Sequence, residues 1–201
     1  MCLAKIFFNL APYFIMKKLL LLLILINCCA CNKAPKDFIN ATITDTQNKP
    51  TSIAVLANNK LTVIYFLGTD CPISQQYSLT LKNLAQTYKE VQMIAVVPGP
   101  LTDGIISYKQ TYNLPFQIYA DSYYQLTKAI NATVTPECFL ISGNTVIYSG
   151  KIDDFAVAPG ITRQRVQQHF LADALDAALS QKQIEVTYTK PAGCFIEVPN
   201  E

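Results

Sequence analysis

The sequence predicts an α/β fold in which a central mixed sheet has helices on both faces. Residues 61–67 form an almost continuous apolar run of strand length, which is typical of a strand buried on both faces. A second β-branched run follows at 91–97, and stretches with apolar residues at helical spacing separate the predicted strands. A hairpin and a final helix close the order, which favours a layered α/β domain.

The first half of the domain is predicted to alternate strands with one helix. The expected elements are a strand at 38–44, a turn at 45–50, strands at 52–56 and 61–67, and a strand at 91–97. Between the last two strands, Pro72 suits a first helical turn, and Tyr77, Leu81, Leu84 and Tyr88 follow at helical spacing.

The second half continues with helices at 102–112 and 122–130 around a strand at 116–120. A strand containing Cys138 passes through the turn at 142–144 into a strand at 145–149. The clearest helix is predicted at 162–179, with His169 opposite its apolar face and therefore in solvent. Asp153 and Asp154 are expected in a solvated turn or helix cap.

Four segments are expected along the chain. Residues 1–30 are a signal or membrane-targeting segment, 31–36 a tether, 37–182 the domain, and 183–201 a C-terminal tail that carries Cys194. Lysines precede a short aliphatic run in the first segment, which is the pattern of a secretory signal and is too short for a clear membrane span. An uncleaved N-terminal anchor is the alternative.

Ala30 before Cys31 resembles the end of a bacterial lipoprotein signal. That resemblance implies that Cys31 carries lipid and that the domain is exported, tethered to a membrane in the bacterial cell envelope and facing the periplasm. The three lysines Lys5, Lys17 and Lys18 lie in the signal, so the rest of the chain has 13 basic and 14 acidic residues and a formal charge of −1. No basic surface for nucleic acid is therefore expected.

Three of the seven cysteines, Cys71, Cys138 and Cys194, belong to the domain and its tail. In an oxidising compartment an odd number leaves at least one thiol free or transiently paired. Cys138 starts an apolar strand and is interpreted as a core residue. Cys71 lies between a predicted strand and Pro72, where a helix N-terminus lowers the pKa of a thiol. The alternative for Cys71 is a buried structural thiol.

The chain resembles the thioredoxin superfamily, and within it the redoxin branch of alkyl hydroperoxide reductase/thiol-specific antioxidant (AhpC/TSA) domains. Three segments carry the resemblance: Asp70-Cys-Pro-Ile-Ser74, Ala132-Thr-Val-Thr-Pro136-Glu and Tyr148-Ser-Gly-Lys-Ile-Asp-Asp154. The end Gly193-Cys194-Phe-Ile is also similar to that of some redoxin-like proteins. The resemblance implies a thioredoxin-like fold and a cis Thr135–Pro136 bond beside the thiol, where residue 135 offers backbone groups to an incoming peptide or thiol.

The chain departs from the family patterns at several positions. Ser74 stands where thioredoxin-like reductases have their second cysteine. Peroxiredoxins have proline, threonine and a later arginine where this chain has Ile64, Gly68 and Glu137, and the chain's arginines are Arg163 and Arg165. Cys194 is either a resolving partner for Cys71 or a static tail cysteine.

The expected function is thiol–disulfide exchange through Cys71, with Thr135 and Pro136 aligning the substrate and Cys194 or an external thiol resolving the mixed disulfide. The expected partners are protein or small-molecule thiols and disulfides, and no cofactor is expected. The first alternative is a one-cysteine peroxide reductase. The second is a copper-binding assembly module resembling the Sco proteins, with Cys71, Cys194 and His169 as ligands. A redox-inactive binding domain is the remaining possibility.

Overall fold

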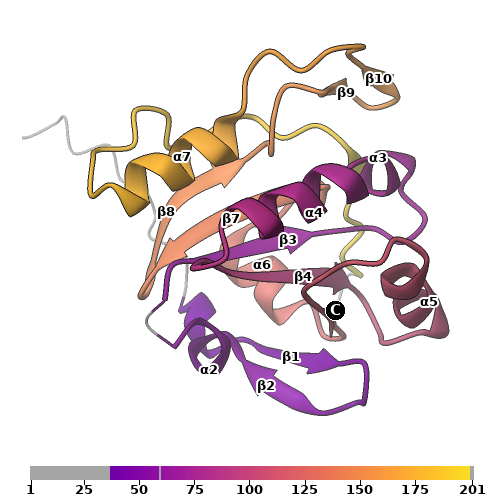
Figure 1. Ribbon diagram of the computed structural model, residues 1–201. Coiled ribbons are helices and arrows are strands. Elements are labelled where there is room, and N and C mark those ends of the chain that lie inside the picture. Colours follow the sequence, from indigo (N-terminus) through magenta and orange to yellow (C-terminus); the bar gives the residue numbers. More distant parts are fainter. Residues whose placement is uncertain (1–36, 59, 200–201) are drawn as a thin grey trace, which may run out of the picture. The chain divides into compact units, whose positions relative to one another are not determined.

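The computed structural model describes residues 37–58 and 60–199, and within them a mixed sheet of seven strands forms the centre (Figure 1). The strand order is β2-β1-β5-β4-β3-β7-β8. The strands are β1 (Thr42–Asp45), β2 (Pro50–Ser52), β3 (Thr62–Phe66), β4 (Gln92–Pro98), β5 (Gln117–Asp121), β7 (Glu137–Ser142) and β8 (Thr145–Gly150). The predicted mixed sheet is confirmed.

Strand β3 lies inside the sheet and carries the site at its carboxyl end. It runs parallel to β4 and antiparallel to β7. All five of its residues are buried, and its side chains alternate between two apolar clusters, with Tyr65 in one and Ile64 and Phe66 in the other. Because both faces of β3 are covered, its end is a rigid support for the loop that follows.

Helices cover both faces of the sheet, as the sequence predicts. They are α2 (Ile53–Ala57), α3 (Pro72–Gln76), α4 (Ser78–Thr87), α5 (Asp103–Thr111), α6 (Gln125–Ile130) and α7 (Phe170–Leu179), with a 3-10 turn, η1 (Phe38–Asn40), before β1. Helices α3, α4, α5 and α7 contribute to the apolar cluster on one face, and α2 and α6 contribute to the cluster on the other.

The prediction of one helix over 162–179 is wrong in its first half. Residues 156–162 form a hairpin of β9 (Ala156–Ala158) and β10 (Ile161–Thr162), and α7 begins only at Phe170. The physical reason is Asp154, whose Oδ1 accepts the backbone N–H groups of Gln167 and Gln168 at 2.8 and 3.1 Å. His169 is therefore the N-cap residue of α7, and it is exposed.

Asp153 and Asp154 are expected in a solvated turn or helix cap, and the expected solvation is wrong because both residues are buried. Asp153 accepts hydrogen bonds from the Tyr77 hydroxyl and from the backbone N–H of Phe155. Asp154, besides its two backbone donors, forms an ion pair with Arg163 at 3.2 Å. The two carboxylates thus join the segment before α7 to the body of the domain.

Three smaller differences lie at the start of elements. The strand expected at 38–44 begins at Thr42, after the 3-10 turn η1. The strand expected at 52–56 ends at Ser52, whose hydroxyl accepts the N–H of Val55 and so caps α2. The helix expected after Pro72 is two helices, α3 and α4, which meet at the buried Tyr77. All three changes are local, so the order of strands is unaffected.

The C-terminal tail runs back across the domain. Thr187 and Thr189 exchange backbone hydrogen bonds with Ser149 at the edge of β8. The tail then forms β11 (Cys194–Phe195), which pairs antiparallel with β6 (Val134–Thr135). In Figure 1 this yellow segment passes beside the start of α3.

The predicted signal and tether, including Cys31, lie outside the described residues. Among residues 37–58 and 60–199, no helix has the length and apolar character needed to cross a bilayer.

Candidate functional site

Cys71 lies in the junction between the end of strand β3 and the start of helix α3. It follows the turn 68–70 after β3, and it is the N-cap residue of α3, with Pro72 in the first helical turn. The turn is closed by the Cys71 N–H, which donates to the Gly68 carbonyl at 3.2 Å. A Cβ on residue 68 would lie 2.8 Å from Thr135 Oγ1 and 3.0 Å from Cys71 Cβ, so any larger residue there would force one of these side chains to shift. The Cys71 residue is only 4% exposed.

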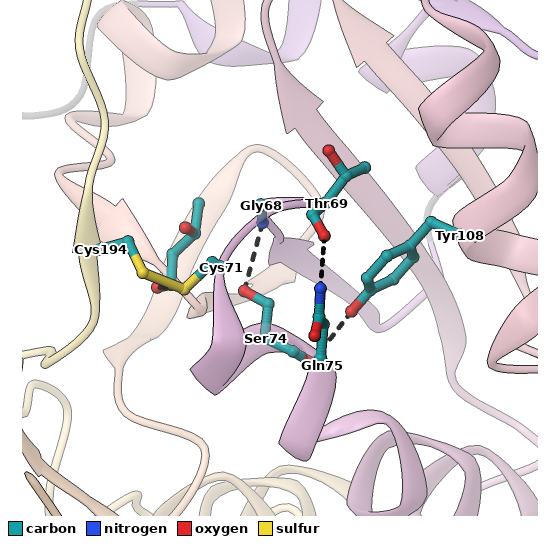
Figure 2. Close-up of a disulfide and its surroundings, with 8 residues drawn as sticks. Gly68, Thr69, Cys71, Ser74, Gln75, Tyr108 and Cys194 are labelled. Carbon is teal, nitrogen blue, oxygen red and sulfur yellow. Dashed lines mark hydrogen bonds between the residues drawn. A yellow bond between two sulfur atoms is a disulfide. The ribbon is translucent and has the colours of Figure 1, made fainter. Parts of the chain in front are cut away.

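Ser74, in the place of a second thiol, holds this turn instead of reacting. Its buried hydroxyl accepts the Gly68 N–H at 3.2 Å, and its carbonyl accepts the Tyr108 hydroxyl at 2.9 Å (Figure 2). The Gln75 amide donates to the Thr69 carbonyl at 2.9 Å. These bonds fix the loop that presents Cys71.

The Thr135–Pro136 peptide bond is cis, as the family resemblance implies. The Thr135 carbonyl oxygen lies 3.1 Å from the Cys71 sulfur. Behind this loop, the buried Glu137 carboxylate accepts the N–H groups of Thr133 and Val134 at 2.8 and 3.4 Å. Burial raises the pKa of Glu137, and these hydrogen bonds oppose the rise. Glu137 therefore holds the backbone that faces the sulfur.

Cys194 forms a disulfide with Cys71, with 6.1 Å between the two Cα atoms. Figure 2 shows Cys194 reaching Cys71 from the C-terminal segment, on the side away from Ser74. Cys194 is partly exposed, whereas Cys71 is buried. The structure therefore brings together Cys71, Thr135, Pro136 and Cys194, the four residues that the sequence singled out.

A groove of about 310 Å³ leads to the disulfide. Its walls come from the Cys71 turn, the end of β4, Tyr124, Thr135 and the tail: Gly68, Thr69, Asp70, Cys71, Val97, Pro98, Tyr124, Thr135, Cys194, Phe195, Ile196 and Glu197. Both sulfur-bearing residues line it, so an external thiol has a route to the bond.

Cys138 does not belong to this site. It is fully buried in β7, with its sulfur 3.3 Å from the Gly150 carbonyl, as expected of a core thiol. Burial raises its pKa well above the ordinary thiol value, and the Glu137 and Asp153 charges add to the rise. Such a thiol is unreactive at neutral pH.

The side chains that the two alternatives need in addition to the cysteines are not among the groove residues: His169 for copper, and Arg163 or Arg165 for a peroxide. His169 is close enough to Asp153 to lower the pKa of that carboxyl, against a larger rise caused by burial. Among the described residues, no group of three or more His, Cys, Asp or Glu side chains is placed to hold a metal ion. Arg163 pairs with Asp154 and is not among the groove residues.

Comparisons with known proteins identify the family and the fold of the chain. Residues 32–150 match the AhpC/TSA family, so the chain belongs to that family of thioredoxin-fold redoxins. The match includes Cys71 and Pro136 and ends before Cys194. No curated protein matches the chain.

Solved structures show the same fold. A hypothetical protein from Sinorhizobium meliloti 1021 is 20% identical, with a TM-score of 0.72 over 84% of this chain and 96% of its own. An uncharacterised conserved protein from Geobacillus kaustophilus is 22% identical, with a TM-score of 0.71 over 84% and 93%. A thiol-disulfide oxidoreductase from Bacteroides fragilis is 14% identical, with a TM-score of 0.51 over 70% and 94%.

Sequence reasoning assigned no role to Gly193, Tyr124 or Ser74. Gly193 is buried against the Thr135 carbonyl, Tyr124 lines the groove, and Ser74 fixes the turn. The sequence feature that could have drawn attention to Gly193 is its position directly before Cys194. Tyr124 has no comparable local signal, because its role depends on where the start of α6 lies relative to β4.

Proposed function

We propose that this protein is an exported, membrane-tethered thiol–disulfide oxidoreductase whose redox pair is Cys71 and Cys194. The observation that carries the proposal is the disulfide between these residues, placed beside the cis Thr135–Pro136 bond and lining an open groove. The AhpC/TSA family membership and the fold shared with a thiol-disulfide oxidoreductase support the same chemistry.

The proposed reaction starts from the reduced protein. The Cys71 thiolate attacks one sulfur of a substrate disulfide, a mixed disulfide forms, and the other substrate sulfur leaves as a thiolate. The Cys194 thiolate then attacks the Cys71 sulfur, which releases the second substrate thiolate and restores the Cys71–Cys194 disulfide. Two electrons pass from the protein to the substrate.

Regeneration of the reduced pair is proposed to begin at Cys194. An external thiolate reaches the partly exposed Cys194 sulfur more readily than the buried Cys71 sulfur. Cys71 then leaves as the thiolate, and a second external thiolate frees Cys194. The tail is well placed to return, because Thr189, a few residues before Cys194, is attached to β8 by its own hydrogen bond to Ser149, which does not involve the disulfide.

Insulin reduction with dithiothreitol as the electron donor tests the proposal. Cys71→Ser should abolish the activity, and Cys194→Ser should accumulate a mixed disulfide between Cys71 and the substrate. Cys138→Ala is the matched control, since Cys138 is buried and outside the site, and it should retain the activity. Full activity of the Cys71→Ser protein would refute the proposal.

The proposed location needs a separate measurement, because the N-terminal segment lies outside the described residues. Mass spectrometry of the mature N-terminus should find cleavage before Cys31 and a lipid on its sulfur. An intact N-terminus in the membrane fraction would instead favour the uncleaved anchor.

A further inference from the structure

The edge of β6 is occupied by the protein's own tail. Among the described residues, β6 and β11 form a separate two-stranded sheet in which Cys194 lies opposite Thr135 and Phe195 opposite Val134. The pairing continues beyond β11, because the Ile196 N–H donates to the Thr133 carbonyl at 3.0 Å. When the tail leaves, these backbone groups of residues 133–135 lose their partners and become available to another extended chain.

The fit of the tail sets a requirement for the residue before the cysteine. Gly193 is buried, and a Cβ there would overlap the backbone carbonyl of Thr135 and come within 3.1 Å of the Pro136 nitrogen. Both obstacles are backbone atoms of the cis-proline loop, which cannot rotate away as a side chain would. A chain that takes the place of the tail must therefore have glycine at this position.

The two residues after the cysteine have different surroundings. The Phe195 residue is 78% exposed, so this position makes little demand on the side chain. Ile196 is partly buried against the apolar cluster that also contains Leu126 and Ile130 of α6. An apolar residue is therefore favoured at the second position after the cysteine.

We propose that Gly193-Cys194-Phe195-Ile196 is an internal pseudosubstrate, and that it marks the substrate class of this site. The substrates are extended peptide segments that pair with β6 and contain glycine directly before the reacting cysteine and an apolar residue two positions after it. The disulfide Cys71–Cys194 has the same connectivity as the mixed disulfide with such a segment. Tail and substrate compete for one strand edge, so the disulfide form is closed to peptides, whereas in the reduced form a peptide can displace the tail.

This inference rests on the proposed exchange at Cys71, and one reaction can test the two separately. The full-length Cys194→Ser protein is mixed with the peptide Pro-Ala-Gly-Cys-Phe-Ile-Glu, whose cysteine is joined to thionitrobenzoate by a disulfide. The Cys71 thiolate attacks the peptide sulfur, a Cys71–peptide disulfide forms, and thionitrobenzoate leaves as a coloured thiolate with the electron pair. Absorbance gives the rate, and the Cys71→Ser, Cys194→Ser double variant gives the background.

Valine in place of the peptide glycine should slow the reaction about tenfold or more, because the added atoms meet the backbone of residues 135 and 136. Aspartate in place of the isoleucine should slow it about fivefold, through loss of an apolar contact. Alanine in place of the peptide proline is the matched control and should change the rate by less than about twofold, because the corresponding Pro191 is not among the groove residues.

Equal rates for the glycine and valine peptides would overturn the pseudosubstrate inference and leave thiol–disulfide exchange intact, provided that the symmetrical thionitrobenzoate disulfide still reacts with Cys71. No reaction with either kind of disulfide would overturn both proposals.

A second arm tests the competition in cis. Gly193→Val in the Cys194→Ser protein should dislodge the tail and raise the rate with the glycine peptide about threefold or more. An unchanged or lower rate in a folded protein would show that the tail does not occupy the substrate position.

Discussion

At the scale of single residues, the buried carboxylate of Glu137 supports the loop that faces the Cys71 sulfur. It accepts hydrogen bonds from Thr133 N–H, Thr133 hydroxyl and Val134 N–H, so it fixes the two residues that lead into Thr135. Peroxiredoxins have arginine in this place, where its charge acts on a peroxide. Here the side chain satisfies backbone donors, which is a structural role that prepares β6 to receive a strand.

The raised pKa of Glu137 makes the stability of the protein depend on pH. Because burial favours the protonated form in the folded state, stability is fully present below the ordinary value near 4.5 and is lost as pH rises through the raised pKa. Glu137→Gln keeps an acceptor for the backbone N–H groups and removes the titration. We expect the free energy of unfolding, measured by urea titration, to fall less for the Glu137→Gln variant than for wild type as the pH rises through this range.

Asp153 also has a raised pKa, but it contributes equally to both proteins and cancels in the comparison. Parallel pH profiles for wild type and Glu137→Gln would contradict the assignment of this slope to Glu137.

At the scale of elements, Tyr77 links the α3–α4 junction to the segment that precedes α7. Its hydroxyl donates to Asp153 and accepts the Ala156 N–H at 3.4 Å, and its ring meets Phe155 edge-on at 5.4 Å between centroids. Burial and the Asp153 charge raise the pKa of Tyr77 far above its ordinary value, so it stays a hydrogen-bond donor. The buried Tyr77 hydroxyl therefore links the C-terminal end of α3 to the first residue of β9.

Tyr77→Phe keeps the ring contact and removes this hydroxyl. We expect the free energy of unfolding to fall by about 1–3 kcal/mol, because Asp153 remains buried with one donor fewer. The matched control is Tyr88→Phe, whose hydroxyl donates to Asp176 of α7 at a less buried site, and which should cost less than about 1 kcal/mol. Equal losses of unfolding free energy in the two variants, measured by urea titration, would contradict the larger stabilising contribution assigned to the Tyr77 hydroxyl.

The elements also show what can be predicted from the sequence. The strands at 62–66 and 92–98 have local signals in their composition, and the Cys71–Pro72 junction lies at a motif, so the sheet and the position of the thiol were predictable. The start of α7 was not, because Asp154 captures amides 13 and 14 residues further along the chain. Val166 is the one apolar residue in 162–169, and its spacing from Phe170 fits a helix regardless of that capture.

At the scale of the whole molecule, the pairing of Cys194 with Cys71 depends on the path of the tail. Thr187 and Thr189 attach the tail to Ser149 of β8, and Thr189 Oγ1 accepts the Lys151 N–H at 2.8 Å. A Cβ on Gly150 would overlap Thr189, so the tail can lie this close to the edge of β8 because residue 150 has no side chain. These contacts direct residues 190–194 toward the groove, and none of them has a signal in the tail's own sequence. That is why the role of Cys194 stayed open at the sequence level.

The disulfide closes a loop across most of the domain, with a sequence separation of 123. By the chain-entropy account, such a long loop removes much freedom from the unfolded chain, and reduction should lower the free energy of unfolding by about 3–5 kcal/mol. Urea unfolding with and without dithiothreitol measures this loss, and Cys194→Ser is the control that should not respond to reductant. The reduced protein should still fold, because most residues of both apolar clusters come from the sheet and its helices, and the tail adds Ala192 and the partly buried Ile184, Cys194 and Ile196. If reduction left stability unchanged, the tail would be held by its β8 and β6 contacts alone, and the disulfide would serve exchange without serving the fold.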